Sequence, residues 1–278
     1  MQKEPEEIEE SFKLPEGWHV MHLFYHVNHG VLSELDEEER EELKLDFEEL
    51  IDEIKLQEGM QVQVYAMATP KADLGVMLVG EDLEQMIYFE KRITLGLGVE
   101  VLVPAYSYYS HTERSEYTTT AEQYAQDTLI GEKGLTPDSE EWNKEMEIFK
   151  ERIKHYTSYR IYPKLPKLAT MCFYPMSKKR DGEDNWFSLT FNERKDLMKG
   201  HAKVGRTYSG RVLQLITGSC GLDEYEWGVT LWGKSTYDIK AIVYEMRFDE
   251  VSAKYADFGD FYIGIQIPIK DIFRQLSL

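Results

Sequence analysis

The chain has 278 residues, of which 42% are hydrophobic and 30% charged, and this composition supplies enough apolar side chains for a packed core. Its 32 basic and 51 acidic residues give a net charge of −19, which argues against nucleic acid or an anionic membrane surface as a partner. We find neither an apolar stretch of the roughly 20 residues that span a bilayer nor a secretion signal at the acidic start. Two cysteines are too few for a disulfide scaffold, so we expect a protein of the reducing cytoplasm.

The first half of the chain predicts strands and helices in the order β-α-β-β-α-β. Residues 18–27 are rich in β-branched and aromatic side chains and predict a strand. Residues 34–57 place apolar side chains on one helical face and acids on the other, which predicts an amphipathic helix. The pattern continues with two strands, a helix and a strand at about 60–68, 73–79, 81–95 and 100–110.

Four histidines, His19, His22, His26 and His29, lie close together in this half. On a helix they would share one face and suit a metal ion. On the predicted strand, His22 and His26 share one face while His19 and His29 take the other. We therefore favour structural roles for these side chains over a metal site.

Residues 111–159 fit neither half of the chain. Thr118–Thr120 and two glycines mark a loop, and a charged helix is expected from Asp138 or Ser139 to about His155. We interpret this stretch as a mobile connecting segment or lid.

The second half repeats the order of the first. A capping box formed by Thr190 and Glu193 predicts the start of a helix that runs to about His201. A second helix face is expected around residues 239–246. The strands of this half are expected at 171–176, 211–217, 226–232 and 261–267. The chain thus predicts an α+β protein of two ferredoxin-like halves, 1–110 and 160–278, with antiparallel sheets covered by helices and joined as a duplicated α+β barrel.

The second half also carries a local excess of basic residues. Residues 160–212 hold 12 bases and 5 acids, whereas residues 1–60 hold 5 bases and 19 acids. A basic stretch in an acidic protein indicates a small anionic ligand, because the surrounding field would repel a long polyanion. An ordinary charged surface is the alternative.

Two features of this stretch could carry chemistry. His201, expected at the end of its helix, could cap that helix or coordinate a haem iron as neutral imidazole. Residues 174–180, YPMSKKR, place a phenol, a thioether and three cations at a strand end, which suits a ligand with an aromatic body and carboxylate arms. The motifs of common nucleotide-binding proteins, metalloproteases and serine hydrolases are not found.

Several long motifs, in the same order, resemble those of the coproheme decarboxylases. These enzymes form the haem-synthesis branch of the chlorite dismutase-like superfamily, and the resemblance is to the form found in monoderm bacteria. The motifs lie at 172–186, at His201 with 205–210, at 225–231 and at 246–259, with weaker anchors at 71–74 and 104–108.

The resemblance implies a homopentamer of duplicated ferredoxin-like protomers with the porphyrin in the C-terminal half. The implied reaction uses hydrogen peroxide to convert iron-coproporphyrin III (coproheme) into haem b, removing two of four propionates as carbon dioxide. The substrate is then also the cofactor. Residues 111–159 could gate the porphyrin entrance, contact a neighbouring subunit or dock the ferrochelatase that delivers coproheme.

The resemblance also implies roles for single residues. His201 matches the proximal iron ligand, Tyr174 the tyrosine that becomes a radical and takes hydrogen from a propionate, and Gln214 the distal residue. The remaining matches hold propionates or pack beside the porphyrin: Arg160, Lys178, Arg247 and Ser252 as propionate ligands, Met176 as the packing residue, and Tyr117 as a further carboxylate contact.

Two other functions stay open at this point. Chlorite dismutases of the superfamily carry a distal arginine, whereas this chain has neutral Gln214, and Arg211 lies on the other side of the strand. That difference disfavours chlorite chemistry. A porphyrin carrier or sensor could share the pocket, but it would not need a redox-active Tyr174 beside a propionate.

Overall fold

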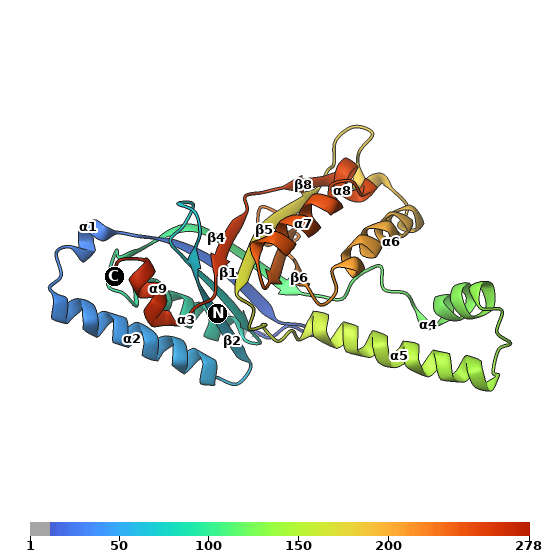
Figure 1. The fold of residues 1–278 in the computed structure, drawn as a ribbon, viewed down its shortest axis with the longest axis horizontal. Helices are drawn as coiled ribbons and strands as arrows, with labels where there is room; N and C mark the ends of the chain where they lie inside the picture. The colour runs from blue at the N-terminus through green and yellow to red at the C-terminus, as the bar shows by residue number, and fades with distance from the viewer. Residues whose placement is uncertain (1–11) are drawn as a thin grey trace, which may run out of the picture. The chain divides into compact units, whose positions relative to one another are not determined.

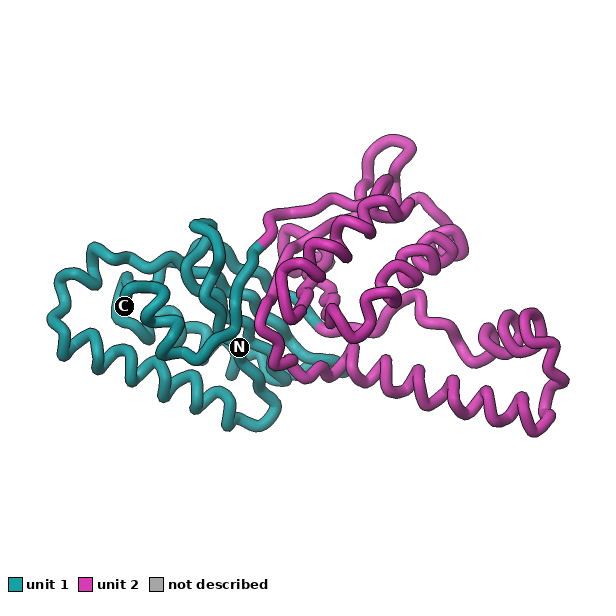
Figure 2. Tube along the Cα trace, viewed as in Figure 1, with its two compact units in different colours: residues 1–111, 262–278 teal, residues 112–261 magenta. Residues whose placement is uncertain are grey.

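The computed structural model describes residues 12–278, and Figure 1 shows their helices and strands. The chain forms two compact units, coloured separately in Figure 2. Unit 1 runs to His111 and includes Tyr262–Leu278, and unit 2 is Thr112–Phe261. Between residues 12 and 278, no helix combines the length and the apolar character needed to cross a membrane.

Unit 1 contains an antiparallel sheet in the order β4-β1-β3-β2-β9. Every residue of the central strand β3 is buried, so its side chains are covered on both faces of the sheet. The strands are β1 (His19–Val27), β2 (Met60–Met67), β3 (Leu74–Gly80), β4 (Leu102–Thr112) and β9 (Tyr262–Ile265).

The helices of unit 1 pack on one face of this sheet. Asp36 and Glu39 form a capping box that begins α2, and the apolar stripe of α2 enters the core. The helices are α1 (His29–Leu32), α2 (Glu37–Leu56), α3 (Leu83–Leu95) and α9 (Ile269–Gln275). The predicted β-α-β-β-α-β order of this half is confirmed.

The last strand differs from its prediction. A strand was expected at 261–267 within the second half, but β9 pairs with β2 of unit 1, with Ala66 opposite Ile265 and Met67 opposite Gly264. Gly264 permits this close approach, because a Cβ there would lie 2.9 Å from the Tyr65 Cβ. The predicted repeat boundaries, 1–110 and 160–278, stay a prediction. The two compact units have different boundaries, because Tyr262–Leu278 belongs to unit 1.

Unit 2 contains a second antiparallel sheet in the order β6-β7-β5-β8. Its strands are β5 (Thr170–Lys178), β6 (Val212–Gly218), β7 (Trp227–Gly233) and β8 (Ala256–Phe258). Its helices are α6 (Phe191–Thr207), α7 (Thr236–Met246) and α8 (Glu250–Tyr255), together with the short turn η2 (Trp186–Ser188). An antiparallel sheet with helices thus recurs in both units, and the predicted α+β, duplicated ferredoxin-like fold class is confirmed.

Helix α6 begins as predicted but is longer than predicted. Thr190 and Glu193 form the expected capping box, yet the helix continues six residues beyond His201 to Thr207. His201 therefore lies inside the helix, and the expectation that it ends the helix is wrong. The glycine before it, Gly200, is tolerated in the helix interior.

The connecting segment 111–159 is mostly helical. It contains α4 (Ala121–Gln123), the π-helix η1 (Tyr124–Glu132) and α5 (Glu140–Ile161), which Ser139 caps. Tyr124 stacks on Phe149 with ring centroids 4.0 Å apart, inside a small apolar cluster built by this segment alone. The predicted charged helix is therefore present.

Candidate functional site

Four of the predicted site residues share one face of the unit 2 sheet. Tyr174, Met176 and Lys178 alternate along β5 and so point to the same side. Leu231 of β7 lies opposite both Cys172 of β5 and Gln214 of β6. Since directly opposed residues share a face, Gln214 lies on the same face as Tyr174.

Helix α6 covers this face near Gln214. A Cβ placed on Gly205 of α6 would lie 3.6 Å from Gln214 Nε2 and 3.3 Å from Met246 Cε at the end of α7. Gly205 therefore leaves the space that these two side chains occupy. The same helix carries His201 one turn earlier.

His201 is held by a buried carboxylate. Its Nδ1 lies 2.7 Å from Asp249 Oδ2, and only 6% of the Asp249 side chain is exposed. Burial acts to raise the pKa of Asp249, but hydrogen bonds from His201 and Ser252 outweigh it, so the pKa lies below its ordinary value. An ionised Asp249 fixes the His201 proton on Nδ1 and leaves Nε2 as the acceptor or metal-binding nitrogen.

Asp249 also connects Ser252 to this pair. Its carboxylate caps α8 by accepting the backbone N–H groups of Val251 and Ser252, and it accepts the Ser252 hydroxyl at 3.0 Å. The structure therefore links two of the predicted residues, His201 and Ser252, through a third that the sequence analysis did not single out. Asp249 does lie within the 246–259 motif.

Tyr174 is an almost fully buried phenol. Its ring stacks on Phe261 with centroids 4.4 Å apart, and burial raises the pKa of the hydroxyl well above its usual range. Among residues 12–278, no side chain or backbone group hydrogen-bonds that hydroxyl. The guanidinium of Arg247 lies over Phe258, 3.6 Å from the ring centroid, close enough for its charge to act on Tyr174.

Lys178 presents a desolvated cation on the same face. Burial lowers the pKa of its ammonium to about 8, although the charges of Asp249 and Glu226 act to raise it. The ammonium lies 4.8 Å from the centroid of the Trp186 ring. An anionic group placed here would replace the lost hydration of the cation.

Tyr117 joins the same cluster through Trp186, because the two rings meet edge to face at 6.4 Å. The Tyr117 hydroxyl accepts a hydrogen bond of 3.2 Å from Arg194 Nε of α6. Trp186 was not singled out from the sequence, although it ends the 172–186 motif. Its part here is to separate and support the two predicted residues Lys178 and Tyr117.

Arg160 is not brought into this cluster. It lies at the end of α5, and its Nε donates to the carbonyl oxygen of Glu113 at 3.3 Å. Within residues 12–278, no hydrogen bond, ion pair or ring contact joins Arg160 to the other predicted site residues. Burial raises the pKa of the Glu113 carboxyl, and the charge of Arg160 opposes that shift.

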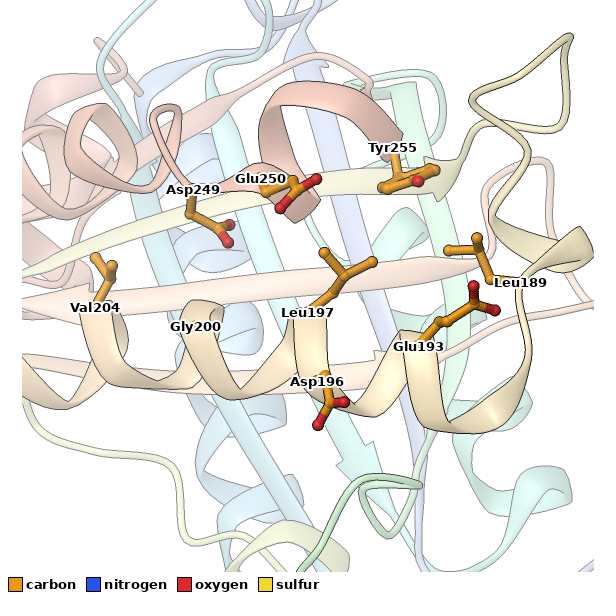
Figure 3. Close-up of a pocket in the computed structure, with 9 residues that line it drawn as sticks. All are labelled: Leu189, Glu193, Asp196, Leu197, Gly200, Val204, Asp249, Glu250 and Tyr255. Atoms are coloured by element: carbon orange, nitrogen blue, oxygen red, sulfur yellow. The ribbon is translucent and has the colours of Figure 1, made fainter.

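A cavity of about 660 Å³ lies between α6 and α8 (Figure 3). This volume falls in the range of small-molecule sites. The lining residues are Leu189, Glu193, Asp196, Leu197, Gly200, Val204, Asp249, Glu250 and Tyr255. None of the nine predicted site residues is among them. Four carboxylates disfavour an anion in this cavity, whereas the sheet face with Lys178 favours one.

The N-terminal histidines belong to unit 1. His19 Nδ1 lies 2.7 Å from the Tyr109 hydroxyl, and burial lowers the pKa of His22 to about 3. His26 Nδ1 lies 3.4 Å from an Asp73 carboxylate oxygen. In the part of the chain that the structure describes, no three or more His, Cys, Asp or Glu side chains are grouped so as to hold a metal ion.

Comparisons with known proteins agree with this architecture. A haem-binding protein from Thermus thermophilus is 34% identical, with a TM-score of 0.77 over 95% of this chain and 96% of its own. A mutant chlorite dismutase from Candidatus Nitrospira defluvii is 16% identical, with a TM-score of 0.71 over 95% of this chain and 98% of its own, which shows a shared fold. The family model for chlorite dismutase matches residues 40–267, so the chain belongs to the chlorite dismutase family.

Proposed function

We propose that this protein is a cytoplasmic, peroxide-dependent coproheme decarboxylase that converts iron-coproporphyrin III into haem b in haem biosynthesis. The observation that carries the proposal is the sheet face of unit 2. There the buried phenol of Tyr174, whose hydroxyl has no hydrogen-bond partner among residues 12–278, lies two and four positions from Met176 and Lys178 on one strand. The helix that covers this face carries His201.

The residues present fit an iron porphyrin with carboxylate arms. His201 offers Nε2 to iron while Asp249 holds Nδ1–H, the usual arrangement of a metal-bound histidine. Lys178 and Arg247 offer a compact and a planar cation to propionates, and Ser252 offers a hydroxyl. Arg160 and Tyr117 would contribute further carboxylate contacts, and Gln214 would offer a neutral amide to the porphyrin site.

When bound, the iron porphyrin with hydrogen peroxide supplies the oxidising power, one peroxide for each propionate. Each reacting propionate would lose its carboxylate as carbon dioxide and give up two electrons and one proton as its two remaining carbons become a vinyl group. Together with one further proton from solvent, these would reduce the peroxide to two waters. Tyr174 would lose one electron and one proton and recover a hydrogen atom from the propionate. The hydroxyl is protonated at neutral pH, as a hydrogen-atom relay requires, and burial raises its pKa further above the ordinary value of about 10.

A porphyrin carrier or sensor is the second candidate. It is favoured by the relative that is 34% identical, which is described as a haem-binding protein. Chlorite dismutation is the less favoured alternative, because neutral Gln214 replaces the cation expected at the distal position. Tyr174 separates decarboxylase from carrier, since binding alone needs no phenol beside a propionate.

The test is to add iron-coproporphyrin III and peroxide and to identify the products by mass spectrometry. We expect haem b from the native chain and none from Tyr174→Phe, although that variant should still bind the porphyrin. Tyr237→Phe is the matched control, because Tyr237 is 74% exposed on α7 and should behave as the native chain. Haem b from Tyr174→Phe would contradict the relay, and unchanged porphyrin with the native chain would favour a carrier.

The proposal includes a homopentameric assembly and transfer of coproheme from ferrochelatase. Both rest on the resemblance. Sedimentation analysis of the native chain tests the first, and a single-protomer mass would contradict it. The second is tested by mixing the chain with coproheme-loaded ferrochelatase and comparing the rate of coproheme uptake with the rate for free coproheme.

A further inference from the structure

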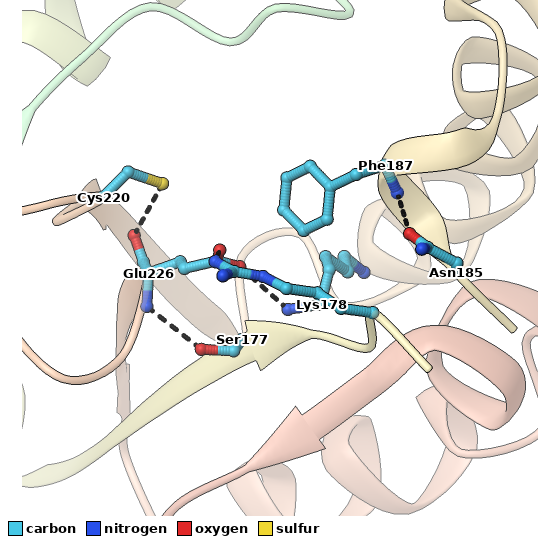
Figure 4. A network of polar contacts seen from close by, with 7 residues as sticks. Ser177, Lys178, Asn185, Phe187, Cys220 and Glu226 are labelled. Atoms are coloured by element: carbon cyan, nitrogen blue, oxygen red, sulfur yellow. Dashed lines mark hydrogen bonds and ion pairs between the residues drawn. The ribbon is translucent and has the colours of Figure 1, made fainter. Parts of the chain in front are cut away.

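A buried acid, Glu226, holds three chain segments together at the end of β5 (Figure 4). Its backbone N–H donates to Ser177 Oγ at 3.2 Å, and its carbonyl accepts the Ser219 N–H at 2.7 Å. Its side-chain carboxylate accepts the backbone N–H of Lys178 at 3.1 Å. Only 7% of that side chain is exposed.

Arg180 provides the counter-charge for this carboxylate. Its guanidinium forms an ion pair and hydrogen bond with Glu226 Oε1 and lies 5.1 Å from the centroid of the Phe187 ring. The Phe187 N–H is in turn capped by Asn185 Oδ1 at 3.0 Å. The loop between β5 and η2 is therefore held near its start by Arg180 and capped at its end by Asn185.

This arrangement bears directly on Lys178, the last residue of β5. A strand end lacks the support of further strand residues, and here Glu226 supplies a charge-assisted hydrogen bond to the backbone of Lys178. The fastened loop also returns Trp186 beneath the Lys178 ammonium, since the Trp186 N–H donates to the Lys179 carbonyl at 3.0 Å. Glu226 thus holds the Lys178 backbone directly. Through Arg180, which contacts Phe187, it also supports the turn that carries Trp186.

We propose that Glu226, paired with Arg180, is a positioning residue that orients Lys178 toward a carboxylate of the substrate. The identity of that substrate, iron-coproporphyrin III, rests on the proposed function. The positioning role itself is a property of the free chain. It also accounts for the acid of the 225–231 motif and for the third cation of the 174–180 run.

The main test is a double-mutant cycle on porphyrin affinity. Glu226→Gln keeps the size of the side chain and an acceptor for the Lys178 N–H, but it removes the charge that pairs with Arg180. We expect roughly tenfold weaker binding of iron-coproporphyrin III in a Soret titration, a size typical of contacting residues that act together. In Lys178→Ala, the added Glu226→Gln should cost nothing further; fully additive losses would overturn the proposal.

Two controls separate positioning from charge and from folding. Glu224→Gln makes the same charge change two residues away on an exposed side chain, and its affinity should match that of the native chain. If Glu226→Gln does not fold, Arg180→Gln takes its place, because Arg180 is 67% exposed and its replacement opens no cavity in the core. The same non-additivity with Lys178→Ala is expected, and additive losses would again refute the role.

A measurement on the free chain keeps this role distinct from the proposed function. The Glu226 charge supports the protonated state of Lys178, so Glu226→Gln should lower the pKa of Lys178. The pH dependence of acylation at Lys178, followed by mass spectrometry, reports that change without porphyrin. If the native chain binds no coproheme, the proposed function fails, but this measurement still tests the positioning role of Glu226. An unchanged Lys178 pKa in Glu226→Gln would contradict that role.

Discussion

At the scale of single residues, Lys178 is a buried lysine whose proposed role, holding a substrate carboxylate, requires the protonated form. A lysine whose pKa lies near 8 loses its proton just above neutral pH, whereas an ordinary lysine keeps it to about 10.4. A bound carboxylate would raise that pKa again, because it favours the charged form. Porphyrin affinity should therefore be constant below about pH 8 and fall as the pH rises from there toward the pKa of the complex.

The expected decline is up to about tenfold per pH unit, the limit for one coupled proton. Dissociation constants for iron-coproporphyrin III measured from pH 6.5 to 9.5 check it. Lys178→Arg removes this titration, because arginine stays protonated throughout the range. Identical profiles for the native chain and Lys178→Arg would show that Lys178 does not hold a carboxylate.

Asp249 allows a second test at this scale. Asp249→Asn keeps a good N-cap for α8, since asparagine caps about as well as aspartate, but removes the charge that holds His201 Nδ1–H. We expect the iron–imidazole bond to weaken, with a lower stretching frequency in the resonance Raman spectrum and about 10–100-fold weaker iron binding. His201→Ala should abolish that band, and its persistence would remove the ligand assignment.

At the scale of elements, two glycines of α6 are expected to behave oppositely. A Cβ on Gly200 would meet no atom within 4 Å, so Gly200→Ala should stabilise the helix by about 0.8–1.0 kcal/mol, the difference in helix propensity. Gly205→Leu should instead displace Gln214 and Met246, which lie where its side chain must go. Thermal unfolding should show a higher Tm for Gly200→Ala and a lower one for Gly205→Leu. A gain from both would contradict the packing of α6 on this sheet.

The sequence predicts most elements of both units within a few residues, for identifiable reasons. The capping box at Thr190 is a local signal, and so are the strand alternation and the helical spacing. It could not predict where α6 ends, because packing overrides the weak helix propensity of Gly200. Nor could it show that β9 pairs with β2, since alternation identifies a strand but not its neighbour.

The candidate site divides in a similar way. Tyr174, Met176 and Lys178 share a face by the two-residue period of a strand, which the sequence alone implies. Asp249 and Glu226 are different, because their importance lies in contacts with residues 48 positions away, His201 and Lys178. Such pairs carry no local signal in one sequence.

At the scale of the whole molecule, the chain places one compact unit inside the sequence of the other. Residues 262–278 return to unit 1, where Ile272, Phe273 and Leu276 are part of the core cluster. Unit 2, with the candidate site, is thus an insertion whose two ends both continue into unit 1. The domain boundary cannot be reduced to one cut point in the chain.

This nesting has a consequence during synthesis. A ribosome releases the first strands and helices of unit 1 early, but α9, whose side chains are part of their hydrophobic core, emerges only after all of unit 2. Until α9 is synthesised, the core of unit 1 lacks the α9 side chains, while all residues of unit 2 are already available to fold. Unit 2, which carries the candidate site, can therefore fold before unit 1 is complete. A nascent chain stalled before α9 would expose the apolar surface of the unit 1 core to cellular quality control.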